Sequence, residues 1–404
     1  MHPPAPQPGE PTTAGTAAFA RINRAMVFGG FTTFSLLYCV QPVMPLLSGE
    51  FSLTPVQSSW VLSISTLTLA ISLIISSAIS ERVGRKPMMG IAVALAALTT
   101  VLCAFANDFM QLLGLRALLG FALGGMPAVA LAYLGEEIEK TSLGQSIGLY
   151  IAGSAFGGMF GRLLAAWLGD HFSWRVAFAV LGAAGLYVAW DFWRSLPPAR
   201  NFQPMPQSGR DLLEGARQHF MDPGLAMLFC LAFFLMGCFV SLYNYLGYRL
   251  LAAPFNLSHS AMGTISLLYL LGIGSAVWVG RLVDRVGRRG VLWLVLLTML
   301  CGLLLTLSAA LPVVILGTAV FTFGFFASHS VASSWVARRA RAPKALASAL
   351  YLFFYYLGSS LMGSLTGLLW ERNGWSGVVL GLGAVLGLAL LISLRLRSLQ
   401  PVAA

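Results

Sequence analysis

The chain of 404 residues is 57% apolar and only 10% charged, whereas about 25% of the residues in a typical soluble domain are charged. A soluble fold could not solvate such a surface, so water-soluble enzymes and nucleic-acid-binding modules are excluded. A membrane-spanning helix needs about 20 mostly apolar residues. Twelve such helices leave about 160 residues for loops and termini, which suits a polytopic membrane protein.

Residues 1–20 are rich in Pro, Ala and Thr without an apolar run, which predicts a disordered cytoplasmic tail. Apolar windows predict six spans before a polar gap, at residues 24–47, 58–80, 88–106, 110–134, 143–168 and 174–194. Six more follow, at residues 224–247, 260–281, 290–309, 312–336, 345–369 and 376–394. We therefore predict an all-α membrane protein with twelve transmembrane helices in two pseudo-symmetric six-helix bundles, 21–195 and 224–395. A cytoplasmic linker over 196–223 joins them, and a cytoplasmic tail over 396–404 ends the chain.

The basic residues predict the orientation of these spans. With both termini on one side, most of the 25 Lys and Arg residues fall in loops on that side. Cytoplasmic loops carry an excess of Lys and Arg. Both termini are therefore predicted to be cytoplasmic, which also supports an even number of spans.

The two halves share a repeated pattern. The loop after the second span reads S-A-I-S-E-R-V-G-R-K from Ser77 to Lys86, and the loop after the eighth reads G-R-L-V-D-R-V-G-R-R from Gly280 to Arg289. Small residues also recur every fourth position in the fifth and eleventh spans, at Gly153, Gly157 and Gly161 and at Ser359, Gly363 and Gly367. Such spacing lets helix backbones approach closely in lipid, so these residues are predicted to pack helices.

These loops resemble the signature G-x-x-x-D-R-x-G-R-K/R of the major facilitator superfamily, which lies between spans two and three and again between spans eight and nine. The second copy matches fully, at Gly280, Asp284, Arg285, Gly287, Arg288 and Arg289. The first copy matches at Arg82, Gly84, Arg85 and Lys86, with Glu81 in place of Asp and Ser77 in place of the leading Gly. The resemblance implies the fold of that family and transport by alternating access.

Other stretches resemble the proton-coupled efflux branches of the family. The fourth span carries the R-x-x-x-G pattern at Arg116, Gly120 and Gly124. The fifth is similar to the antiporter motif G-P-x-x-G-G at Gly153, Gly157 and Gly158, with Ser154 in place of Pro. Tyr38–Pro42, Glu136–Ile138 and His329–Trp335 resemble a drug/proton-antiporter-like, arabinose-efflux-like subgroup of bacterial inner-membrane transporters. This similarity implies a location in the bacterial inner membrane.

The repeated loops predict a cytoplasmic gate. A carboxylate at the end of an even span, Glu81 or Asp284, can face the positive N-terminus of a helix in the other bundle. The neighbouring Arg residues can bridge to Glu136 or Glu137. The alternative is that these charges only enforce topology and tight turns.

None of the 14 acidic residues lies in the middle of a predicted span. Arg116 is costly in hydrocarbon, so it should face a polar cavity and orient water, a proton or a substrate, unless it snorkels or pairs with Asp108. His329 lies inside the tenth span, and the reference pKa of a histidine, about 6.5, suits reversible protonation. It is a candidate proton site or simply a packed side chain. Glu136 and Glu137 are rival proton carriers, or else belong to a solvated helix end.

The family resemblance implies a cavity lined by spans one, four, seven and ten. Candidate lining residues, besides Arg116 and His329, are Tyr38, Gln41, Tyr243, Asn244 and Tyr245. Each aromatic among them could instead face lipid. Efflux proteins for organic cations usually place a carboxylate in the first span, where this chain has Tyr38 and Gln41. A neutral, zwitterionic or anionic substrate is therefore favoured.

The sequence thus favours a secondary transporter that exports a small organic compound, a drug or a metabolite, in exchange for protons. No Walker motif occurs, so we expect no cofactor and take the proton gradient as the energy source. The five cysteines lack metal-site spacing, so no metal is expected. The expected partners are the substrate, protons and the lipid bilayer, for a monomer that binds no nucleic acid and is not an enzyme. The alternatives are an uncoupled facilitator or importer of the same fold and, less favoured, a membrane-embedded transferase.

Overall fold

The computed structural model describes residues 10–204, 209–341 and 344–399. In these residues the regular structure is helical, apart from one isolated parallel bridge between Thr12 and Ile138. Two compact units are formed, one from Met1–Val40 with Thr68–Gln207 and one from Gln41–Leu67 with Ser208–Ala404. This grouping places Gln41–Leu67 with the second unit. The predicted bundles, 21–195 and 224–395, instead follow the order of the spans along the chain, and these bounds stay a prediction.

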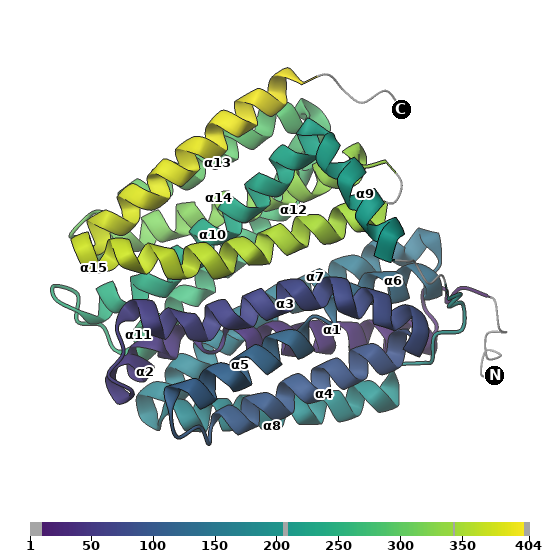
Figure 1. Cartoon of the computed structure of the whole chain (residues 1–404), viewed down its shortest axis with the longest axis horizontal. Helices are drawn as coiled ribbons and strands as arrows, with labels where there is room; N and C mark the ends of the chain where they lie inside the picture. The colour runs from purple at the N-terminus through teal and green to yellow at the C-terminus, as the bar shows by residue number, and fades with distance from the viewer. Residues whose placement is uncertain (1–9, 205–208, 342–343, 400–404) are drawn as a thin grey trace. The chain divides into compact units, whose positions relative to one another are not determined.

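The elements of the first half of the chain are, in order, α1 (Ala17–Tyr38), η1 (Gln41–Val43), α2 (Met44–Glu50), α3 (Pro55–Val83), α4 (Arg85–Cys103), α5 (Phe109–Leu123), α6 (Pro127–Glu137), α7 (Lys140–His171) and α8 (Trp174–Ser195) (Figure 1). In the first unit α1 packs on α7 and α8, and α4 packs on α5 and α8. Helix starts carry side-chain caps: Asp108 accepts a hydrogen bond from the backbone N–H of Gln111, and Ser173 from that of Val176.

The elements of the second half are α9 (Gly209–Met221), α10 (Pro223–Leu251), α11 (His259–Thr264), η2 (Ile265–Leu268), α12 (Tyr269–Val286), α13 (Arg288–Leu305), α14 (Leu311–Arg339) and α15 (Lys344–Ser398). In the second unit α10 packs on α15 and α14, while α14 also packs on α12 and α13. Asp222 caps α10 through the N–H groups of Gly224 and Leu225, and its carboxylate also pairs with Arg339 of α14 at 2.7 Å.

Eleven helices within the described residues are long and apolar enough to cross a membrane. The last, Leu346–Ser398, has 53 residues, about 80 Å at the α-helical rise and far more than the ~30 Å of a hydrocarbon core. Gly374 interrupts it with a left-handed backbone, φ 58°. The eleventh and twelfth predicted spans therefore meet at Gly374, and the predicted all-α membrane fold with two six-span halves is confirmed.

Three predicted spans are broken rather than continuous. The first ends as a helix at Tyr38 and resumes as η1 and α2, and the fourth is divided between α5 and α6. Pro42, Pro45 and Pro127 lie at or just after these breaks, and a proline cannot donate the backbone hydrogen bond of a helix interior. The eighth span consists of α11, η2 and α12.

The structure differs from our prediction at the N-terminal tail. We expected this tail to extend to residue 20. Helix α1 already begins at Ala17, where the Thr16 hydroxyl accepts from the N–H of Phe19. Thr12 is 7% exposed and exchanges backbone hydrogen bonds with Glu137 and Glu139. The last part of the predicted tail therefore packs on the first unit.

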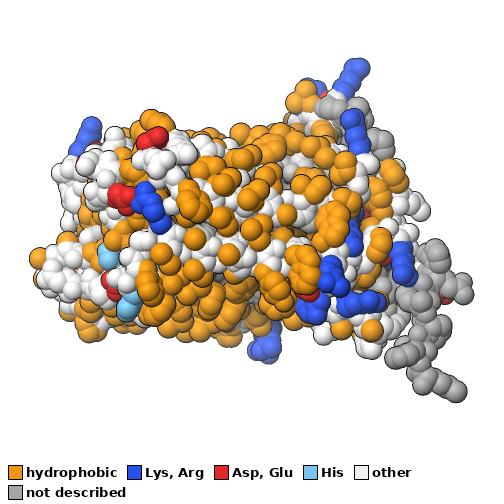
Figure 2. Space-filling model, turned by 90° about the horizontal axis from the view of Figure 1, so that it is seen from below, with side chains coloured by type: hydrophobic (Ala, Val, Ile, Leu, Met, Phe, Trp, Pro, Cys, Tyr) orange, Lys and Arg blue, Asp and Glu red, His pale blue; other side chains and the backbone are white. Residues whose placement is uncertain are grey.

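Hydrophobic side chains cover most of the face shown in Figure 2, and Lys and Arg side chains gather mainly toward the right of that view. The exposed apolar residues include Leu98, Phe105, Tyr187, Trp190 and Trp193. So much exposed apolar surface is incompatible with water and is typical of a protein surrounded by lipid.

Candidate functional site

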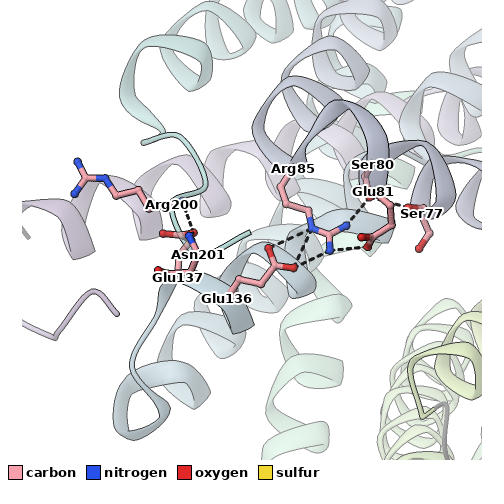
Figure 3. A network of polar contacts seen from close by, with 8 residues as sticks. All are labelled: Ser77, Ser80, Glu81, Arg85, Glu136, Glu137, Arg200 and Asn201. Atoms are coloured by element: carbon pink, nitrogen blue, oxygen red, sulfur yellow. Dashed lines mark hydrogen bonds and ion pairs between the residues drawn. The ribbon is translucent and has the colours of Figure 1, made fainter. Parts of the chain in front are cut away.

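The first signature loop is held by an arginine between two carboxylates (Figure 3). The Nη2 atom of Arg85 lies 2.7 Å from Oε1 of Glu81 and 2.7 Å from Oε1 of Glu136. Arg85 also donates to the Ser80 hydroxyl at 2.7 Å, and its side chain is only 7% exposed. We call Glu81, Arg85 and Glu136 the first-loop network. The predicted bridge from an Arg of this loop to Glu136 is present within the first unit, while the gating role stays a prediction.

Local backbone geometry explains why this loop contains a glycine. Gly84 separates α3 from α4 with φ 92°, a conformation that side-chain-bearing residues rarely adopt. Arg82 at the end of α3 is exposed, and Lys86 lies over the ring of Trp193 at 5.9 Å.

Glu137 has a different environment from its neighbour Glu136. Its side chain is buried, and its Oε1 accepts hydrogen bonds from the backbone N–H groups of Arg200 at 2.6 Å and Asn201 at 2.8 Å. The backbone carbonyl of Glu137 accepts a further bond from Thr12 at 2.7 Å. Glu137 therefore ties the start of the linker and the N-terminal segment to the end of α6 (Figure 3).

The second signature loop contains the same residue types with different contacts. Gly287, with φ 83°, again separates the two helices. Arg288 donates to the Ser334 hydroxyl of α14 at 3.2 Å, and Arg289 donates to the carbonyl of Leu399. Asp284 and Arg285 are exposed. A hollow of about 160 Å³ opens here, lined by Val279, Gly280, Val283, Asp284, Arg288, Ser330, Val331 and Ser334.

Arg116 lies inside the first unit with 1% of its surface exposed. It donates to the carbonyls of Leu36 at 3.2 Å and Leu37 at 2.8 Å, in the last turn of α1. Because α1 stops at Tyr38, these carbonyls need partners, and a cation is favourable at the negative end of a helix. Arg116 therefore caps the broken first span. Its burial rules out snorkelling, and Asp108 caps α5 instead.

A second buried arginine, absent from the predicted site, reaches the same turn. Arg162 of α7 is 2% exposed, donates to the carbonyl of Gly158 at 2.7 Å and lies over the ring of Tyr38 at 4.1 Å. Its position within an apolar run was the signal available in the sequence, the same signal that marked Arg116. Both guanidiniums therefore lie at the last turn of α1, Arg116 on two backbone carbonyls and Arg162 on the ring of Tyr38.

His329 lies in an aromatic cluster of the second unit. Its Nδ1 is 3.0 Å from the hydroxyl of Tyr351, and its ring centroid is 4.7 Å from that of Tyr355 and 6.2 Å from that of Phe325. Phe325 stacks on Phe239 at 3.8 Å. The cluster continues to Tyr243, whose hydroxyl is 2.8 Å from that of Thr322.

The remaining predicted cavity residues are separated into different contacts. Gln41 donates to the side-chain carbonyl of Asn244 at 2.7 Å, and Tyr245 donates to the backbone carbonyl of Gly363 at 2.9 Å. Tyr38 belongs with Arg162 in the first unit. The structure joins Gln41 to Asn244, and Tyr243 to the His329 cluster, while the predicted cavity stays a prediction.

The predicted packing glycines lie at close helix contacts. A Cβ atom on Gly153 would lie 2.7 Å from the carbonyl oxygen of Val27, and one on Gly161 would lie 2.6 Å from that of Ser35. Gly157 meets α1 at Phe31 in the same way. Gly120 is buried within α5. Each of the other glycines faces a side chain: Gly124 faces Ser72, Gly158 faces Arg162, Gly363 faces Asn244, and Gly367 faces Tyr245.

Within the described residues, no group of three or more His, Cys, Asp or Glu side chains is placed to hold a metal ion. The site residues described above comprise buried arginines, a half-buried histidine with phenolic neighbours, and ion pairs at helix ends. Together with spans arranged in two halves, these features define a polytopic membrane protein rather than a soluble one.

The Major Facilitator Superfamily model matches residues 26–253 and 244–403. The inner membrane transport protein YnfM of Escherichia coli (strain K12) is 45% identical over 391 residues, which cover 97% of this chain and 94% of that protein. The MFS-type transporter YybF of Bacillus subtilis (strain 168) is 44% identical over 365 residues, 90% of each chain. A crystal structure of a bacterial homologue of the human lysosomal transporter Spinster matches with a TM-score of 0.75 at 16% identity, over 95% of this chain and 96% of that one.

The chain belongs to the Major Facilitator Superfamily, as its signature loops predict. It is a multi-pass membrane transporter whose relatives include a bacterial inner-membrane protein. Those relatives are named as transporters, which is consistent with the expectation that the chain is not an enzyme.

Proposed function

We propose that the protein is a secondary active transporter that exports a small organic compound, a drug or a metabolite, in exchange for protons. Both termini lie in the cytoplasm in this proposal, and the bacterial inner membrane is its location. The basic loops support the orientation. The antiporter-like Gly153–Gly158 stretch of α7 supports exchange.

The observation that carries the coupling is the environment of His329. An imidazole can take up and release a proton near neutral pH, and a charge change inside a span alters the free energy of the conformations that bury it. The Tyr351 hydroxyl, 3.0 Å from Nδ1, can donate to the neutral ring or accept from the protonated one. Protonation can therefore change the contact between α14 and α15.

The rival carboxylates are less suited to this role. Glu136 is already paired with Arg85, and Glu137 accepts two backbone hydrogen bonds from the linker. Protonating either would weaken contacts that hold the first unit together. We therefore assign the proton to His329 and structural contacts to the two glutamates.

Proteoliposomes that contain a pH-sensitive dye test this assignment. Addition of an exported compound from a chemical panel should move protons in the direction opposite to the compound, and His329→Gln should abolish the proton movement while preserving compound binding. Tyr355→Phe is the matched control, because it keeps an aromatic ring beside His329 and adds no charge. Compound flux that ignores an imposed pH gradient in the unmodified protein would instead establish the uncoupled facilitator.

A further inference from the structure

We propose that the hollow beside the second signature loop binds a phosphate group, which a phosphorylated metabolite or the headgroup of an anionic lipid can supply. The hollow lies in the second unit, where α12, the start of α13 and α14 contribute its lining residues. This inference goes beyond the proposed transport function, because neither proton coupling nor the His329 cluster requires a ligand at this place.

Arg288 lines the hollow with donors that no protein acceptor occupies. Its Nε atom donates to the Ser334 hydroxyl at 3.2 Å, and that hydroxyl in turn donates to the carbonyl of Val331 at 3.0 Å. Within the part of the chain that the structure describes, the two terminal nitrogens of Arg288 form no hydrogen bond or ion pair. A guanidinium carries five N–H donors in a planar fork that matches two oxygens of a phosphate. Arg288 is therefore held at one nitrogen and keeps a bidentate pair of donors for a ligand.

The side of α14 that borders the hollow is polar. Ser330 and Ser334 both line the hollow and are one helical turn apart, and Arg338 follows one turn further along the same side. Among the described residues, the Ser330 hydroxyl and the Arg338 guanidinium have no hydrogen-bond or ion-pair partner. Hydroxyl groups and guanidiniums both donate to phosphate oxygens. Helix α14 thus adds a hydroxyl and a second positive charge to the donors of Arg288.

The start of α13 adds a helix terminus at the same place. This helix of 18 residues begins at Arg288, and its N-cap residue Gly287 offers no side-chain acceptor to the first backbone N–H groups. A helix N-terminus carries a partial positive charge that favours phosphate. Val279, Val283 and Val331 form the apolar part of the lining and are buried. Such apolar walls strengthen the attraction between an anion and the positive groups beside it.

The first signature loop shows how the protein itself can neutralise an arginine at this position. Arg85 lies 2.7 Å from Glu81, four residues before it, and 2.7 Å from Glu136. Asp284 stands four residues before Arg288 in the same register, yet no ion pair joins these two side chains in the described structure. Because the spacing is the same in both loops, the different contact of Arg288 leaves this guanidinium available to an external anion.

Asp284 is the acidic residue among the described residues that line the hollow. Arg288 and Arg338 together outweigh it by one positive charge. The carboxylate of Asp284 repels a phosphate, so it lowers the affinity of the site. It is exposed, so water and salt screen this repulsion in part. Removing its charge should therefore strengthen binding, an effect that loss of structure cannot imitate.

Titration with soluble phosphates tests the site directly. The purified full chain in detergent is titrated with inorganic phosphate and with phenyl phosphate, and phosphorus NMR line broadening gives the dissociation constants. Arg288→Gln should weaken binding by about tenfold, because it removes a charged pair of donors. Arg338→Gln should weaken binding by about threefold, and Asp284→Asn should strengthen it by about threefold. Arg194→Gln is the matched control, because it removes a base from α8 of the first unit, and it should change nothing.

A lipid experiment separates the two sources of phosphate. The chain is reconstituted in nanodiscs of phosphatidylcholine with a minor share of phosphatidylglycerol, and native mass spectrometry measures the phosphatidylglycerol that stays bound. Selective retention that Arg288→Gln reduces and phenyl phosphate displaces assigns the site to a lipid headgroup. Binding of phenyl phosphate without selective retention of lipid assigns it to a soluble phosphorylated compound.

Three results would overturn the proposal: no binding in either experiment, the same binding in Arg288→Gln as in the unmodified chain, or weaker binding in Asp284→Asn. Melting temperatures establish that each variant is folded. Arg288→Lys keeps the charge without the planar fork and should recover part of the affinity. Neither experiment measures transport or needs a pH gradient, so failure of the proposed transport function would leave the phosphate site standing.

Discussion

The two signature loops share a sequence pattern but differ in how their central arginine is neutralised. In the first loop Arg85 lies between Glu81 and Glu136, at 2.7 Å from each. In the second loop, among the residues that the structure describes, Arg288 donates to a hydroxyl, that of Ser334, at 3.2 Å and forms no ion pair, although Asp284 occupies the position of Glu81.

The repeat explains this difference. The offset that carries Arg85 onto Arg288 carries Glu136 onto Arg339. Arg339 is a base, and it pairs with Asp222 at the start of α10. The first loop is therefore closed by an internal ion-pair network, whereas the second leaves a basic surface beside a hollow. A shared motif fixes the turn between the helices, while a single residue on a neighbouring helix decides the charge of the site.

The largest expected effect comes from removing each central arginine in turn. Arg85→Gln leaves two carboxylates close together in a partly buried place, which should cost about 3 kcal/mol of folding free energy. Arg288→Gln loses one hydrogen bond to a hydroxyl and should cost about 1 kcal/mol. Melting temperatures of the purified variants in detergent compare the two, and Arg85→Lys serves as the control that keeps the charge. Equal losses at both positions would mean that the two loops are energetically alike.

A second test concerns Glu137, which the 203-residue offset between the signature loops carries onto Ala340, a residue without a carboxylate. Glu137→Ala removes the acceptor of two linker N–H groups, and we expect a loss of about 1.4 kcal/mol. That loss corresponds to about a tenfold larger population of the released linker. Limited trypsin digestion at Arg200 should therefore accelerate about tenfold. Glu139→Ala is the matched control, and an unchanged rate in Glu137→Ala would show that the linker is held by other contacts.

Much of the fold could be predicted because it depends on local sequence. Apolar runs of spanning length gave the helices, and prolines such as Pro42 and Pro127 mark two of the places where spans break. The repeated E/D-R-x-G-R pattern also predicted both turns, since Gly84 and Gly287 adopt the positive φ angles that favour glycine.

The partners of polar residues could not be predicted in the same way, because they depend on contacts between distant segments. Arg116 was expected to face a cavity, yet it caps the end of α1, a role that follows only once the first span is known to break. Glu136 and Glu137 are neighbours in sequence with unrelated partners, one on α4 and one on the linker. Arg162 was visible as a charge in an apolar run, but its stacking on Tyr38 required the packing of α1 against α7.

The smallest expected effect concerns the N-terminal segment, which touches the first unit beside the first-loop network. Thr12→Pro removes the N–H that donates to the carbonyl of Glu137 at 2.7 Å, and should cost about 1 kcal/mol or less, the value of one backbone hydrogen bond. Thr12→Ala keeps that N–H, so a difference between the two variants isolates the backbone bond from the loss of the side chain. Hydrogen exchange at the amide of Glu139, which donates to the carbonyl of residue 12 at 3.2 Å, should rise several-fold in Thr12→Pro chains. If exchange at Glu139 stays at the Thr12→Ala level, the segment is held without the bridge, and the contrast between the two units at their helix ends rests on Glu137 and Arg85 alone.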